Sequence, residues 1–116
     1  MRMLLAFEEE YQAYRDVMAA AIEILRPRAE VETSALKGLG ERIEAFDPDL
    51  VICTRANIVD PGGRTARIEL SVDPLRPTKV CVDGQHTYRT NLSLEALLAV
   101  VDEAEGLVET GERESV

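Results

Sequence analysis

Three adjacent acidic side chains near the start of the chain are the first residues that could do chemistry. Glu8, Glu9 and Glu10 follow directly after an apolar run at residues 3–7. Carboxylate oxygens are the ligands that hard cations such as Mg²⁺ prefer, so the group could hold a metal ion. The alternative is the acidic first turn of a helix, where the helix dipole stabilises negative charge. We favour the helix turn, and we therefore expect neither a metal nor a cofactor.

Polar side chains also stand at the ends of two later apolar runs. Thr54 and Arg55 end one run, and Asp83 follows another. Arg55 could pair with a glutamate of the acidic group and fill the space of a metal, or it could remain a solvated surface residue. Open α/β folds place their sites at the carboxyl edge of the sheet. At this edge we expect a binding pocket formed by Glu8, Glu9, Thr54, Arg55 and Asp83.

No residue is assigned a catalytic role. His86 is the only histidine, and as a general base it would have Asp83 as a possible orienting partner. A predicted hairpin at this point favours a plain outward-facing residue instead. Cys53 and Cys81 lie in apolar runs, which favours core packing over a reactive thiol. The segment at residues 60–63 contains Pro and two Gly and predicts a turn. We therefore do not expect an enzyme.

Strands and helices alternate before residue 55. Short apolar runs predict strands at residues 3–7, 30–33 and 50–54. Apolar residues that recur every three or four positions predict a helix at 11–25, and a second one that is capped by Ser34 and ends at Phe46. Connections of this length normally join parallel strands. The first half is thus predicted to be a parallel α/β unit.

The second half has a different pattern. Residues 66–73 alternate between apolar and polar side chains, which predicts a strand with one wet face near a sheet edge. The connection at 74–78 is too short for a parallel crossover, so a strand at about 79–82 should be antiparallel or irregular. Asp83-Gly84 predicts a tight turn into a short strand at 86–89.

The chain closes with a predicted helix that Asn91 or Ser93 caps. Its apolar stripe consists of Leu94, Leu97, Leu98, Val101, Ala104 and Val108. Val100 and Leu107 lie outside this stripe and widen the apolar surface, which predicts a homodimer interface on this helix. We expect one domain at residues 1–109 and a polar tail at 110–116.

Two segments carry a family resemblance. They are Met3-Leu4-Leu5-Ala6-Phe7-Glu8-Glu9 and Phe46-Asp47-Pro48-Asp49-Leu50-Val51-Ile52. Together they resemble the first half of a bacterial response-regulator receiver domain, which implies a flavodoxin-like, three-layer α/β fold. The resemblance also implies that Glu8 and Glu9 match the acidic pair that binds Mg²⁺ in that family. Thr54 stands where the family has its phosphoryl-accepting aspartate, and the lysine after the fifth strand is missing. The chain is therefore similar to a degenerate receiver, or pseudo-receiver.

Composition limits the kinds of partner. The 116 residues carry a net charge of -9 and few aromatic side chains, which disfavours nucleic acid. No apolar run is long enough to cross a bilayer, and no signal peptide is evident, so we expect a cytoplasmic protein without membrane contact. The predicted function is non-catalytic protein binding in signalling or regulation, without aspartyl phosphorylation. The alternative is a small metal-dependent or acid/base enzyme that uses the acidic cluster at the sheet edge, formed by Glu8, Glu9 and an acid such as Asp83.

Overall fold

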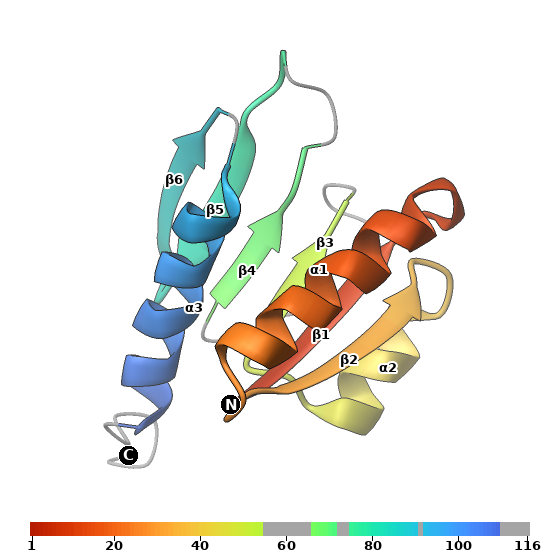
Figure 1. Ribbon diagram of the computed structural model, residues 1–116, viewed down its shortest axis with the longest axis horizontal. Coiled ribbons are helices and arrows are strands. Elements are labelled where there is room, and N and C mark those ends of the chain that lie inside the picture. Colours follow the sequence, from red (N-terminus) through yellow and green to blue (C-terminus); the bar gives the residue numbers. More distant parts are fainter. Residues whose placement is uncertain (55–65, 72–74, 91, 110–116) are drawn as a thin grey trace.

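The apolar run near the start of the chain forms β1 (Arg2–Phe7), which lies inside a six-stranded mixed sheet with the order β2-β1-β3-β4-β5-β6 (Figure 1). The computed structural model describes residues 1–54, 66–71, 75–90 and 92–109. Its other strands are β2 (Glu30–Ala35), β3 (Leu50–Cys53), β4 (Ala66–Glu69), β5 (Thr78–Val82) and β6 (Gln85–Arg89). Its helices are a 3₁₀ turn (Glu9–Tyr11), α1 (Gln12–Leu25), α2 (Leu39–Phe46) and α3 (Leu94–Glu109).

Four strands of the sheet are parallel. β1 pairs in parallel with β2 on one side and with β3 on the other, and β4 continues the parallel arrangement beside β3. The predicted parallel first half is therefore confirmed. The carboxyl ends of all four strands meet at one edge of the sheet, which we call the carboxyl edge.

The last two strands reverse the direction of the sheet. β5 runs antiparallel to β4, and β6 runs antiparallel to β5. Asp83 and Gly84 join them with positive φ angles of 50° and 81°, as a two-residue hairpin turn of this type requires. The predicted antiparallel strand and the predicted turn are both confirmed.

The prediction for β4 was wrong about its place in the sheet. We expected a strand near an edge with one wet face, but β4 lies between β3 and β5. Glu69 is only 8% exposed, and its carboxylate lies 3.8 Å from the guanidinium of Arg67 on the same face. The sequence pattern suggested that water solvates the charges of Arg67 and Glu69. In the structure these two charges are satisfied by an ion pair within one strand.

The start of α2 also differs from the prediction. Ser34 was expected to cap this helix, but it pairs with Ala6 in the ladder between β1 and β2. The helix begins instead after Gly38, whose φ of 85° is left-handed and whose carbonyl accepts the N–H of Arg42 at 3.1 Å. Pairing with the buried strand β1 extends β2 beyond the predicted range of residues 30–33.

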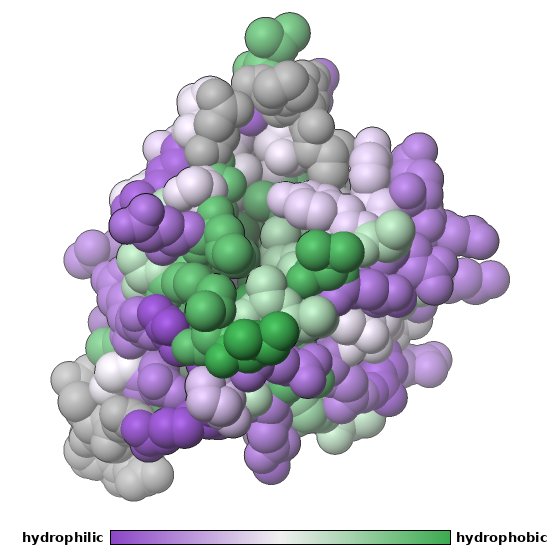
Figure 2. All heavy atoms as spheres, viewed as in Figure 1, coloured by the Kyte–Doolittle hydropathy of each residue, from purple (hydrophilic) through white to green (hydrophobic). Residues whose placement is uncertain are grey.

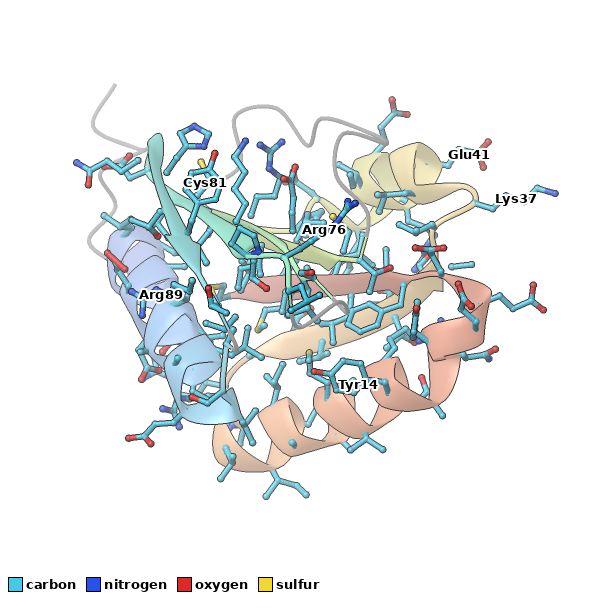
Figure 3. The ribbon with its side chains drawn as sticks, turned by 90° about the horizontal axis from the view of Figure 1, so that it is seen from above. Tyr14, Lys37, Glu41, Arg76, Cys81 and Arg89 are labelled. Atoms are coloured by element: carbon cyan, nitrogen blue, oxygen red, sulfur yellow. The ribbon has the colours of Figure 1, made fainter. Side chains whose placement is uncertain are left out.

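The helices cover the sheet from both sides and create two cores. Alternation along β1 sends Met3, Leu5 and Phe7 toward α1 and α3, and Leu4 and Ala6 toward α2. Figure 3 looks onto the carboxyl edge and shows α1 and α3 on one side of the sheet and α2 on the other. The predicted three-layer α/β arrangement with a C-terminal helix is therefore present.

An ion pair ties α1 to α3 on their shared side of the sheet. The guanidinium of Arg26, just after α1, donates to both carboxylate oxygens of Asp102 in α3 at 2.6 and 2.8 Å. This hydrogen bonding lowers the pKa of Asp102 and raises the pKa of Arg26. At the start of α3, the Ser93 hydroxyl accepts the N–H of Ala96 at 3.1 Å, so Ser93 is a cap as predicted.

The dimer surface predicted on α3 is contradicted at Val100. This side chain is 2% exposed and packs in the core that α3 shares with the sheet, so one chain alone covers it. Leu107 is half-buried. Four residues of the predicted stripe are buried beside Val100, namely Leu97, Leu98, Val101 and Ala104, whereas Leu94 is 43% exposed.

Several predicted features lie outside the described residues. They are Arg55, the turn at 60–63, Asn91 and the tail at 110–116. None of the helices in the described part of the chain combines the length and hydropathy that crossing a bilayer requires.

We predict that alanine at Gly38 and alanine at Gly106 change stability in opposite directions. Gly38→Ala places a Cβ on a left-handed residue and should lower the free energy of unfolding by about 1 kcal/mol. Gly106 lies within α3 with open space where a Cβ would stand, so Gly106→Ala should raise it by about 0.5–1 kcal/mol. Urea unfolding followed by circular dichroism measures both. Changes of the same sign would contradict the left-handed start of α2.

Candidate functional site

The carboxyl edge brings two of the predicted site residues into direct contact. Glu8 follows β1 and Thr54 follows β3, and these two strands are neighbours. The backbone N–H of Glu8 donates to the Thr54 hydroxyl oxygen at 3.1 Å, and Thr54 is 9% exposed. The expectation that these residues meet at one edge is therefore correct. Their contact lies where the chain order reverses around β1, the point at which open α/β sheets place ligands.

Glu9 and Glu10 lie in the 3₁₀ turn that leads into α1. The carbonyl of Glu8 accepts the N–H of Tyr11 at 2.9 Å, which closes this turn. The acidic residues thus occupy the first turn of a helical segment, one of the two arrangements expected from the sequence. Among residues 1–54, 66–71, 75–90 and 92–109, no three His, Cys, Asp or Glu side chains are grouped closely enough to hold a metal ion.

Glu8 and Glu9 line a hollow between the ends of β1 and β2, which we call the β1–β2 hollow. Its volume is about 460 Å³. Arg15 and Lys37 line it too, so two acids face two cations. The Arg15 guanidinium donates to the Ser34 carbonyl at 3.0 Å, whereas Lys37 extends outward from the molecule (Figure 3). Arg15 is therefore already engaged in holding α1 against β2.

A second hollow lies on the other side of the contact between Glu8 and Thr54, and we call it the β4–β6 hollow. Its volume is about 420 Å³. Its lining consists of Thr54, Glu69, Leu70, Ser71, Arg76, Pro77, Lys79 and Tyr88. Of these residues, only Thr54 was predicted from the sequence. The alternation in residues 66–73 was the available signal, because it placed Glu69 on the face away from the core.

Asp83 does not join the other predicted site residues. β5 runs antiparallel, so its last residue, Val82, pairs with Ala66 at the start of β4. Asp83 follows Val82 and lies at the edge opposite to Glu8 and Thr54. The alternative prediction of an enzyme that uses Glu8, Glu9 and Asp83 together loses its third acid, because the sheet separates them.

The two cysteines have different surroundings. Cys53 is buried, while Cys81 is half-buried, and neither cysteine forms a disulfide. The Cys81 sulfur lies 3.9 Å from Nε2 of His86, which occupies the facing position in β6. Cys81 is therefore not the core residue that the sequence indicated, since it lies on the side of the sheet away from α1 and α3 (Figure 3).

We predict that the Thr54 hydroxyl protects the Glu8 amide. Thr54→Val keeps the shape of the side chain but leaves the Glu8 N–H without its acceptor, so the free energy of unfolding should fall by about 1–3 kcal/mol. Thr54→Ser keeps the acceptor and should cost no more than about 1 kcal/mol. Hydrogen exchange measured by NMR should show faster exchange at Glu8 in the valine variant only. Equal protection of the Glu8 amide from exchange in both variants would show that its hydrogen bond to the Thr54 hydroxyl is unimportant.

Comparison with known proteins finds no match for this chain among family models, curated proteins or solved structures.

Proposed function

We propose that this chain is a degenerate receiver-like domain of flavodoxin-like arrangement that works by binding protein in cytoplasmic signalling or regulation. The strand order β2-β1-β3-β4, with α1 and α2 on opposite sides, supports this arrangement. The antiparallel β5 and β6 depart from it, as expected for a domain whose second half has been rebuilt.

The surroundings of Thr54 support a function without aspartyl phosphorylation. By the resemblance to receiver domains, Thr54 corresponds to the aspartate that accepts the phosphoryl group. Its hydroxyl oxygen already accepts the Glu8 N–H, and the side chain is nearly buried. A hydroxyl needs a base to become a nucleophile, whereas the group that contacts the Thr54 hydroxyl is the Glu8 N–H, which is a donor.

An exposed apolar ridge on α1 is the observation that carries the proposal of protein binding. We define the α1 ridge as Tyr14, Val17, Ala21 and Ile24. Val17 is 68% exposed and Ile24 is 77% exposed. Spacings of three, four and three residues align these side chains along one helix face, as in helices that pack against a partner helix. Figure 2 shows apolar side chains gathered over α1 and α3 on this face of the molecule.

A groove continues the α1 ridge toward the start of α3. Its volume is about 140 Å³. Tyr14 and Val17 of the ridge form one wall, and Leu92, Leu94 and Leu97 form the other. The groove is thus a place where an apolar side chain at the end of a partner's helix could insert.

A second copy of this chain is the occupant that fits the α1 ridge. Antiparallel pairing about a two-fold axis sets Tyr14 opposite Ile24 of the second copy, and Val17 opposite its Ala21, so the ridge is complementary to itself. Ile24 of the second copy would then lie at the groove. The ridge holds no charged side chain, so two chains of net charge -9 can meet there without placing like charges in the contact.

We predict that the protein accepts no phosphoryl group from small phosphodonors. After incubation with acetyl phosphate and Mg²⁺, intact-mass spectrometry should show an unchanged mass, because Thr54 replaces the acceptor aspartate and its hydroxyl is engaged by Glu8. A receiver domain with its acceptor aspartate, treated in parallel, serves as the positive control. A stoichiometric adduct would refute the receiver-like proposal in its non-phosphorylated form.

We also predict a homodimer that depends on the α1 ridge. Light scattering after size exclusion at high micromolar concentration should give twice the mass of one chain. Val17→Glu and Ile24→Glu should each give folded monomers, because a charge would be buried in the contact. Gln12→Glu adds the same charge to α1 away from the ridge and should leave the dimer intact. A monomeric wild-type protein, or equal dissociation by Gln12→Glu, would contradict the interface.

A further inference from the structure

Three side chains form a row across the second half of the sheet, on the side of α2. Residue pairing sets Glu69 of β4 opposite Lys79 of β5, and Lys79 opposite Tyr88 of β6. Ile68 and Val80 belong to the core beside α1 and α3. Because side chains alternate along a strand, the row faces the other side. No helix of the described chain packs on that face of β4 to β6, and the row lines the β4–β6 hollow.

Two cations and one carboxylate are among the described residues that line this hollow, although the chain as a whole is acidic. Lys79 and Arg76 line it, and Arg67 lies behind Glu69 at 3.8 Å. Arg67 and Glu69 form an ion pair, so the described cations that line the hollow beyond this pair are Lys79 and Arg76. Among the described residues, the side-chain ammonium of Lys79 has no hydrogen-bonding or ion-pairing partner. Figure 3 shows Arg76 over the middle of the sheet, between α2 and α3. An anion in the hollow would lie against the ammonium of Lys79 and beside the guanidinium of Arg76.

The remaining lining adds groups that suit an organic anion rather than a bare ion. Tyr88 is 65% exposed although it lies in the hollow, so its ring offers a face on which a planar group can stack. The Glu69 carboxylate can accept hydrogen bonds from hydroxyl or amino groups of the same ligand. The hydroxyls of Thr54 and Ser71 can serve an oxyanion. The volume of about 420 Å³ is typical of small-molecule sites.

We infer that the β4–β6 hollow binds a small phosphorylated molecule that carries a planar ring, such as a nucleoside monophosphate. Lys79 and Arg76 hold the phosphate, and Tyr88 stacks on the ring. Glu69 accepts a hydrogen bond from a hydroxyl or amino group between them. A phosphate is favoured over a carboxylate because two cations and two hydroxyls match its larger number of acceptor oxygens. This site is independent of the α1 ridge, which lies on the other side of the sheet.

Isothermal titration of the full chain at low salt tests this assignment, with AMP, adenosine and inorganic phosphate as probes. AMP should bind with a dissociation constant below millimolar. Adenosine and inorganic phosphate should each bind at least about tenfold more weakly, because each keeps only one of the two contacts. Benzoate, which has a ring and a carboxylate, should also bind more weakly than AMP. Raising the salt concentration should weaken AMP binding, since the contact is ionic.

Variants separate the roles of the lining residues. Lys79→Gln should weaken AMP binding by about tenfold or more. Lys37→Gln removes a cation from the β1–β2 hollow at the same edge and should leave the affinity unchanged. Tyr88→Ala should weaken AMP binding about fivefold or more while leaving the affinity for phosphate unaltered. NMR shifts of the Ser71 and Tyr88 amides in the wild-type chain locate the ligand without relying on the folding of any variant.

Three results would overturn the assignment. The first is no AMP binding at millimolar concentration. The second is AMP binding that shifts other amides or that Lys79→Gln and Lys37→Gln affect equally. The third is benzoate binding more tightly than AMP, which would replace the phosphate by a carboxylate.

Discussion

The short connection between β4 and β5 is the constraint on which the second half of this molecule depends. Only residues 70–77 separate the two strands, whereas a parallel crossover takes a dozen residues or more. β5 must therefore reverse direction, and β6 returns beside it through the turn at Asp83 and Gly84. The reversal carries Asp83 to the edge opposite Thr54. It also omits a crossover helix, so no described helix covers the face that carries Lys79 and Tyr88.

The sequence predicted the elements and their directions better than their places in the sheet. Local periodicity identified α1 and α3, and loop length alone predicted that β5 is antiparallel. The same information cannot show that β4 is a central strand. Polar residues alternate with Ile68 in the same way whether they face solvent at a sheet edge or form an ion pair inside the sheet, as Arg67 and Glu69 do. Ser34 failed as a cap for a related reason. Pairing with β1 depends on a strand far away in the sequence, and it outweighed the local capping preference.

The residues of the candidate site were likewise predicted only in part. Glu8 and Thr54 were predicted together because parallel neighbours end at one edge, and the hydrogen bond between them bears this out. The lining by Lys79 and Tyr88 was missed, because it depends on strand pairing that no local pattern reveals. The exposed apolar surface was predicted on α3 rather than on α1, because the sequence does not show how far the sheet extends beneath α3. Val100 is buried in the core that α3 shares with the sheet, while α1 contributes mainly Met18, Ala19 and Ile22 to this core and leaves Val17 and Ile24 outside.

The two hollows at the carboxyl edge differ in charge although one hydrogen bond separates them. In the β1–β2 hollow two acids face two cations, whereas two cations and one acid of the described residues line the β4–β6 hollow. Thr54 lines the second hollow and accepts the Glu8 N–H, and the Glu8 carbonyl accepts the N–H of Tyr11, directly before α1. Two successive hydrogen bonds thus connect the cationic hollow to the start of the helix that carries the α1 ridge. Because the hollow and the ridge lie on opposite sides of the sheet, a small ligand and a second copy of the chain can bind without steric conflict.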